Sequence, residues 1–195
     1  MKEANWVALS EEYVKNLFAD QLPDDMFFHN LIHTGLVVKA ACEIGAVCEL
    51  EKQEMIILQI AAWFHDTGYC YIYDGHEDKS ISNAVTFLKQ LKADEKFISS
   101  VTGCIDATRM PQKPESLIQQ ILCDADMYHL SVDNYLSYSE NLRKEWKAKM
   151  GKSYSNIEWR ELNVTMLVNH KYFTDYGQRV LQQNKLKNID RMLSE

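Results

Sequence analysis

The sequence has few of the residues that interrupt helices, since its 195 residues include three prolines and seven glycines. No stretch rich in proline, glycine or serine divides it, so we expect one domain covering residues 1–195. Strand-like character is confined to residues 69–73, a run too short to suggest a sheet. These absences predict an all-α fold, a single-domain helical bundle.

The sequence also lacks paired cysteines, long apolar runs and an excess of positive charge. Its five cysteines are widely spaced without a CxxC pair, which excludes a zinc ribbon or disulfide framework and favours a reducing, cytoplasmic location. The first residues show no signal peptide, and the most apolar run, residues 55–64, is too short for a membrane span. With a net charge of −7, we expect neither membrane nor long nucleic acid as a partner.

Hydrophobic periodicity predicts helices along most of the chain. Residues 53–66 are apolar on nearly every side, which is typical of a helix in the middle of a core. Ser155 and Glu158 form a capping box that opens a helix towards His170. With a loop at residues 69–75, the remaining helices are expected at 11–22, 30–49, 76–91, 94–107, 114–130, 133–150 and 174–193.

Three segments place metal-binding side chain types inside apolar helices. His29 and His33 are four residues apart, a spacing that puts both on one helix face, and His33 continues the apolar stripe of its helix. His65 and Asp66 close the most apolar helix. Asp124 and Asp126 interrupt a third apolar run, and a buried carboxylate needs a partner charge or a metal.

Each segment has an ordinary structural explanation when taken alone. A buried histidine such as His33 is more often hydrogen-bonded in the core than bound to a metal. The pair His65 and Asp66 could be a polar helix end, and either Asp124 or Asp126 could face solvent. Their co-occurrence points to a shared cation, because burying all of them without one would be costly.

The order of His33, the pair His65-Asp66 and Asp126 on separate helices resembles the HD-domain metal-dependent phosphohydrolase superfamily. The resemblance covers roughly residues 25–130, and helices in residues 131–195 are expected to pack on that core. It implies that these four residues bind one divalent metal ion, with Mn, Fe, Co, Ni, Zn or Mg as candidates.

The resemblance favours Asp126 over Asp124 as the fourth ligand, because the family's terminal aspartate follows an alanine and precedes a run like residues 127–130. Helical spacing agrees, since it places Asp126 at the border of the apolar face and Asp124 away from it. No histidine occurs at residues 105–108, where two-metal members have one. We therefore expect a single tightly held ion.

The resemblance also implies catalytic roles. A divalent metal activates water and polarises the P–O bond, and Asp66 would accept the proton of that water. Residues 28–33 are distantly similar to a segment of cyclic-nucleotide phosphodiesterases, where the histidine four residues before the metal ligand protonates the leaving oxygen. His29 is the candidate for that role, with a surface or helix-capping histidine as the alternative.

The expected substrate is a small phosphorylated molecule, with nucleotides favoured. His76, Glu77 and Lys79 are candidate substrate-binding residues at the start of a helix, although an exposed helix start is the alternative for His76 and Glu77. Lys79 and Arg109 are candidate phosphate clamps, with solvated surface charges as the alternative. Two other functions stay open, a catalytically silent sensor of nucleotide or metal and a di-iron oxygenase.

Overall fold

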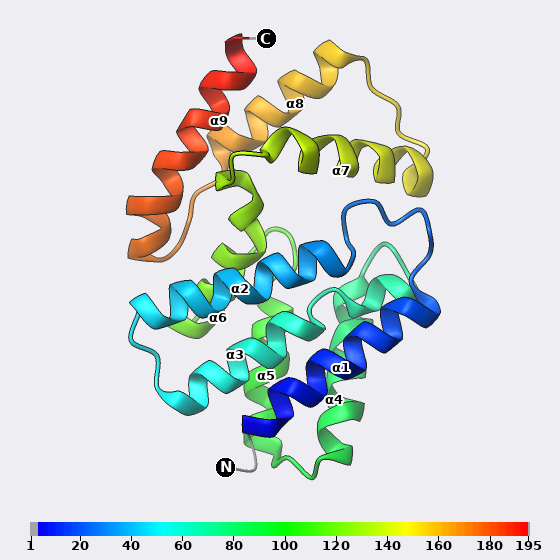
Figure 1. Ribbon diagram of the computed structural model, residues 1–195, viewed down its shortest axis with the longest axis vertical. Coiled ribbons are helices and arrows are strands. Elements are labelled where there is room, and N and C mark those ends of the chain that lie inside the picture. The colour runs from blue at the N-terminus through cyan, green and yellow to red at the C-terminus, as the bar shows by residue number, and fades with distance from the viewer. Residues whose placement is uncertain (1–3, 195) are drawn as a thin grey trace.

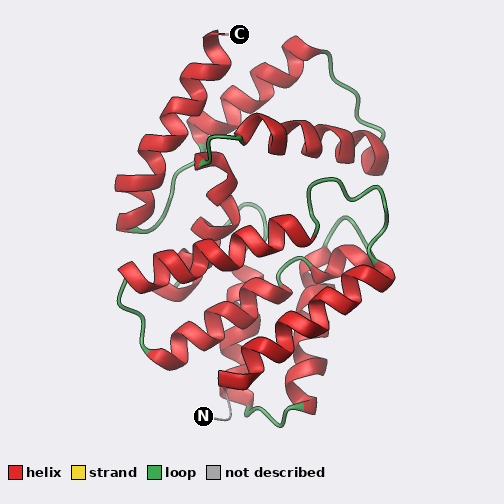
Figure 2. Ribbon diagram, in the orientation of Figure 1, coloured by secondary structure: helices red, strands yellow, loops and turns green. Residues whose placement is uncertain are grey.

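The computed structural model of the protein describes residues 4–194, and within them it is helical without a β-strand, which confirms the predicted all-α fold (Figures 1 and 2). None of the described helices has the length and apolarity needed to cross a bilayer. The α-helices are α1 (Ala4–Gln21), α2 (Leu31–Val47), α3 (Lys52–Phe64), α4 (His76–Gln90), α5 (Glu95–Ala107), α6 (Leu117–Asp126), α7 (Tyr135–Met150), α8 (Asn156–Asn169) and α9 (Gln182–Ser194). The short elements are η1 (Thr67–Cys70), η2 (Met127–Ser131) and the π-helical turn η3 (Gly177–Leu181).

The helices form two groups in space. Helices α1 to α6 make the lower group in Figure 1, and η2 leads from it to the upper group of α7, α8 and α9. A large hydrophobic cluster fills the lower group. A smaller cluster holds the upper group to η2, and its buried members are Leu130, Tyr135, Leu167, Ile189 and Met192.

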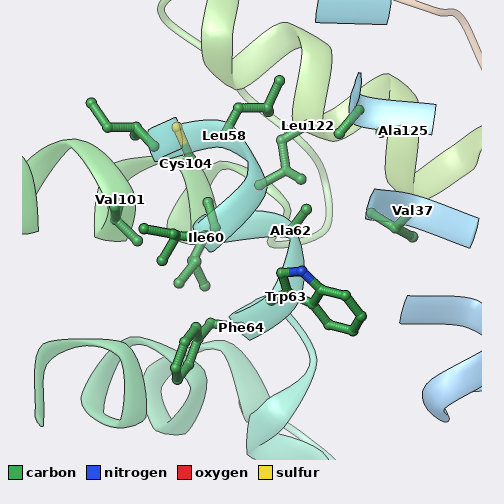
Figure 3. Packing of buried hydrophobic residues seen from close by; sticks show 14 of the residues in the cluster. Val37, Leu58, Ile60, Ala62, Trp63, Phe64, Val101, Cys104, Leu122 and Ala125 are labelled. Atoms are coloured by element: carbon green, nitrogen blue, oxygen red, sulfur yellow. The ribbon is translucent and has the colours of Figure 1, made fainter. Parts of the chain in front are cut away.

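Helix α3 lies in the middle of the larger cluster, as its continuous apolar surface predicts. Ile60, Ala61 and Phe64 are fully buried, and α3 packs against α1, α2, α4, α5 and α6. Figure 3 shows its side chains among Val101 of α5 and Leu122 of α6. Because α3 is central, the residues at its C-terminal end are held by the whole lower group.

Two predicted helix starts are wrong. Helix α1 begins at Ala4 rather than after Ser10, and the buried Ser10 hydroxyl donates to the Trp6 carbonyl 2.8 Å away inside the helix instead of capping its start. Helix α6 follows Ser116 rather than Pro114 and ends at Asp126, where the 3₁₀ turn η2 takes over.

Two other elements refine the predictions. Part of the predicted loop at residues 69–75 belongs to the 3₁₀ turn η1, and the last predicted helix begins with the π-helical turn η3. The capping box of Ser155 and Glu158 is present at the start of α8.

Gly68 allows η1 to lie directly against the start of α4. A Cβ atom at Gly68 would lie 1.8 Å from the backbone oxygen of His76, so any side chain must displace backbone. We expect Gly68→Ala to lower the free energy of unfolding by more than about 2 kcal/mol. Urea unfolding measures this change.

Gly35 provides the matched control, because a Cβ there would meet nothing within 4 Å. Gly35→Ala should raise the free energy of unfolding by up to about 1 kcal/mol through helix propensity. Equal stability of Gly68→Ala and the unmodified protein would show that η1 and α4 are not tightly apposed.

Candidate metal centre

The ends of three helices meet below α7 and bring four of the predicted residues together. His33 lies in the first turn of α2, where the side chain of Asn30 accepts hydrogen bonds from the backbone N–H groups of Ile32 and His33. His65 and Asp66 follow the last residue of the central helix α3. Asp126 is the last residue of α6. Residues far apart in sequence thus share one centre.

The atoms of these residues are close enough to share one cation. Ligand atoms of His33, His65 and Asp66 all lie within 4.8 Å of one another. His33 Nε2 is 3.4 Å from Asp66 Oδ2 and 3.2 Å from Asp126 Oδ1. His65 Nε2 is 3.2 Å from Asp66 Oδ2 and 3.6 Å from Asp126 Oδ1.

Burial and unpartnered atoms show that this donor set fits a metal ion. His33, His65 and Asp66 are each buried, and His65 Nε2 and Asp66 Oδ2 have no hydrogen-bond partner within the described residues. His65 Nδ1 donates to the carbonyl oxygen of Ala62 at 2.8 Å, which leaves the lone pair of Nε2 for a ligand bond. Two imidazoles and two carboxylates suit Mn, Fe, Co, Ni or Zn.

The pKa shifts describe an anionic centre that attracts positive charge. Burial alone would raise the pKa of Asp66, but the adjacent His65 and the hydrogen bond with His76 hold that pKa well below its usual value. Conversely, burial would lower the pKa of His65, but the carboxylates of Asp66 and Asp126 raise it well above the ordinary value. A proton on His65 and a metal ion therefore compete for the same carboxylates.

Asp124, two residues before Asp126, belongs to a separate and structural site. The expectation that Asp124 points away from the apolar face is wrong, since its side chain is fully buried. Its carboxylate accepts hydrogen bonds from the backbone N–H of Phe173 and from the N–H and hydroxyl of Thr174, at 2.7–2.9 Å. Asp124 thus ties α6 to the segment before η3.

Replacing each aspartate by asparagine should therefore have different effects on metal affinity and on stability. Asp126→Asn should weaken metal binding by at least about tenfold, or roughly 1.4 kcal/mol, as measured by calorimetry. Asp124→Asn should leave metal affinity nearly unchanged but destabilise the fold by about 1–3 kcal/mol, because one buried hydrogen bond loses its acceptor. A larger loss of metal affinity in Asp124→Asn would reverse the assignment.

His29 lies beside the centre and is held by a residue that the sequence did not single out. Glu145 of α7 is fully buried and pairs with His29 Nδ1. Tyr73 donates at 3.0 Å to the same oxygen, Oε1, that pairs with His29. The other oxygen, Oε2, accepts from the backbone N–H groups of Phe28 and His29. The pair is 116 residues apart in sequence, so no local pattern indicates it.

Glu145 also sets the charge of His29. Burial alone would lower the pKa of His29, but the hydrogen bond to Glu145 and the nearby carboxylates outweigh this effect and raise the pKa above 6.5. The pKa of Glu145 is lowered in turn by His29 and by two backbone N–H groups, against the opposing effect of burial. The arrangement favours a protonated His29.

The three candidate substrate residues occupy different environments. His76 Nε2 is 3.4 Å from Asp66 Oδ1, so His76 adjoins the metal centre. Glu77 is buried and lies 3.3 Å from the guanidinium of Arg109. Lys79 is exposed and does not line the neighbouring cavity.

A cavity of about 450 Å³ opens from the metal centre towards the C-terminal helices. Asp66, Asp126 and His29 line one end of it, and residues of α7 and α8 line the other. Helices α7 and α8 are thus part of the site, a role that the sequence did not indicate. The apolar C-terminal lining consists of Leu142, Trp146, Met150, Trp159, Leu162 and Met166.

Comparison with known proteins identifies the family. Residues 30–131 match the family model of the HD domain. The chain belongs to this family. The match spans α2 to η2 and so includes His33, His65, Asp66 and Asp126. It ends before Glu145 and before the apolar cavity lining contributed by α7 and α8. No curated protein matches the sequence.

Three solved structures share the fold of this HD-domain protein. A predicted HD superfamily hydrolase from an uncultured Thermotogales bacterium is 18% identical, with a TM-score of 0.65 over 94% of this chain and 91% of that one. Lin1889 from Listeria innocua is 11% identical (TM-score 0.70; 100% and 95% of the chains). YpgQ from Bacillus subtilis, solved in complex with ADP, is 15% identical (TM-score 0.70; 100% and 96%).

Proposed function

We propose that the protein is a metal-dependent phosphohydrolase that cleaves a phosphate ester of a small molecule, with a nucleotide as the favoured substrate. The observation that carries this proposal is the cluster of His33, His65 and Asp66 with Asp126 beside it, which opens into a cavity. Within it, His65 Nε2 and Asp66 Oδ2 lack hydrogen-bond partners among the described residues. Membership of the HD family supports a metal-dependent hydrolase. The predicted hydrolase among the similar structures supports hydrolysis, and the ADP complex of YpgQ supports a phosphorylated ligand.

A divalent ion bound to these four residues would supply Lewis acidity that activates water and polarises the P–O bond. Asp66, whose pKa is held low by its histidine neighbours, lies where it can accept the proton of the attacking water. His29 faces the cavity with Nδ1 held by Glu145, so its Nε2–H is free to protonate the leaving oxygen. His76, whose Nε2 is 3.4 Å from Asp66 Oδ1, would contact the phosphoryl group.

The test is a screen of the purified protein, loaded in turn with Mn, Fe, Co, Ni, Zn or Mg, against phosphate monoesters, diesters and nucleotides. Metal-dependent release of phosphate or of the leaving group is the expected result. If metal binds with one ion per chain but no ester is cleaved, the chain is a sensor rather than a hydrolase. Two irons per chain would instead indicate an oxygenase.

A further inference from the structure

The cavity beside the metal centre contains acidic rather than basic charge. Among the described residues, its charged lining consists of Asp66, Asp74, Glu77 and Asp126, with neither lysine nor arginine. A divalent ion would offset Asp66 and Asp126, and Arg109 pairs with Glu77, but Asp74 has no basic partner among the described residues. Of the three lining histidines, His29 and His76 each face a carboxylate, and His129 contacts the backbone carbonyl oxygen of Asp126 through Nδ1. The cavity therefore offers an anionic substrate little positive charge beyond the metal ion itself.

Two basic side chains, Arg109 and Lys152, contact residues of this lining. Arg109 makes ion pairs with Glu77, Asp78 and Asp106 at 3.3, 2.8 and 3.2 Å, so its charge is fully offset. The ammonium group of Lys152, an exposed residue, lies 5.4 Å from the centre of the Trp146 ring. A polyphosphate needs several cations along its length, as phosphate-binding loops and magnesium sites provide.

The start of α4 does not supply the missing charge. Gly75 and His76 bring this helix N-terminus to the cavity, and helix N-termini attract anions. However, Glu77 and Asp78 occupy its first turn and already offset the partial positive charge.

The far end of the cavity is mostly apolar, and its residues Asn163 and Trp159 make hydrogen bonds within the protein. Asn163 accepts from the hydroxyls of Tyr135 and Ser139 and donates to the carbonyl of Trp159. The Trp159 ring nitrogen donates to Ser139. This end therefore recognises a ligand by apolar and aromatic contact rather than by hydrogen bonds. The side chains that would make this contact are those of Leu142, Trp146, Met150, Leu162 and Met166, defined here as the apolar wall.

We propose that the substrate carries a single phosphoryl group joined to a bulky apolar or aromatic group that lies on the apolar wall, and that nucleoside di- and triphosphates are disfavoured. This inference rests on the proposed phosphohydrolase function. A monoester would place its one phosphoryl group, with about −1.5 to −2 charges at neutral pH, directly at the metal ion. Further phosphoryl groups would approach Asp74, which has no basic partner among the described residues, and Glu77, whose partner Arg109 is shared with two other carboxylates.

Binding of ligands that are not cleaved tests the apolar wall separately from catalysis. We expect 1-naphthylphosphonate to bind the metal-loaded protein at least about tenfold more tightly than methylphosphonate, because both share a head group but only the first buries an aromatic surface. Calorimetry measures both affinities. Leu162→Ala should weaken naphthylphosphonate binding by about fivefold. Leu186 of α9 is the control, because it is a leucine of similar exposure outside the cavity, and Leu186→Ala should leave binding unchanged.

A second arm tests the charge of the cavity with AMP, ADP and ATP as ligands. Affinity should fall as phosphoryl groups are added, and Asp74→Lys should strengthen ATP binding by about tenfold relative to Asp74→Asn. Metal content is measured after each titration, so that chelation by ATP is separated from binding at the site.

The phosphonate and nucleotide binding experiments can each contradict the inference independently of the hydrolysis screen. Tighter binding of ATP than of AMP to the unmodified protein, or equal binding of the two phosphonates, would overturn the inference even if esters are hydrolysed. Absence of hydrolysis with every metal and ester would reject the proposed function, and the binding data would still decide the nature of the ligand.

Discussion

Alanine in place of His65 or Asp66 is expected to reduce the metal content from one ion per chain to below about one tenth of that value. Both residues follow the central helix α3 and are buried, so neither solvent nor a neighbouring side chain can replace the lost ligand atom. His65 Nε2 and Asp66 Oδ2 are also the inward atoms without hydrogen-bond partners in the described chain. Elemental analysis after dialysis against the metal measures the content directly.

Asp20 provides a matched control for this loss, because it is an exposed carboxylate near the end of α1 that belongs neither to the ligand cluster nor to the cavity lining. Asp20→Ala should retain a full complement of metal. Thermal unfolding of each variant separates loss of metal from loss of fold. Unchanged metal content in both His65→Ala and Asp66→Ala would reject the assignment of the centre.

Replacement of His29 should affect turnover rather than metal binding. As the proton donor to the leaving oxygen, His29 is expected to contribute about 10²–10⁴-fold to kcat. His29→Ala should lower kcat by a factor in this range and keep one metal ion per chain, because His29 pairs with Glu145 rather than with the metal cluster. Steady-state kinetics together with elemental analysis measure both quantities, and activity within a few-fold of the original would exclude the role.

Glu145 allows a finer test of the same role through pH dependence. Because Glu145 raises the pKa of His29, activity that needs protonated His29 should be lost as pH rises through that raised pKa. Glu145→Gln should shift this alkaline limb to lower pH and reduce kcat, with metal content unchanged. A profile with an unshifted limb would mean that Glu145 has only a structural role.

Much of the fold followed from local patterns. The continuous apolar surface of residues 53–66 predicted a central helix, and α3 is central. The capping box at Ser155 marks the start of α8. The predicted helix start after Ser10 was wrong because a serine hydroxyl can also hydrogen-bond to the preceding turn of its own helix. Only the surrounding packing selects between capping and this alternative.

The residues of the candidate site, like the fold, were predicted from the sequence only in part. His33, His65, Asp66 and Asp126 interrupt apolar helices, and a polar side chain forced into a core needs a partner, so their pattern was visible in the sequence. Their metal-binding role stays a prediction, although the fold brings them together. Asp124 interrupts the same apolar run, but its partners are backbone N–H groups near Thr174, a contact without any sequence signature.

By itself, the sequence determined the helical class, the central helix and the burial of His33, His65 and Asp66, because hydrophobic periodicity and the cost of burying charge act within one helix. The tertiary structure alone decided that Glu145 of α7 holds His29, that Arg109 is occupied by three carboxylates, and that α7 and α8 close an apolar cavity over the metal centre. Those contacts join segments remote in sequence. They depend on how helices pack across the chain, which no local pattern records.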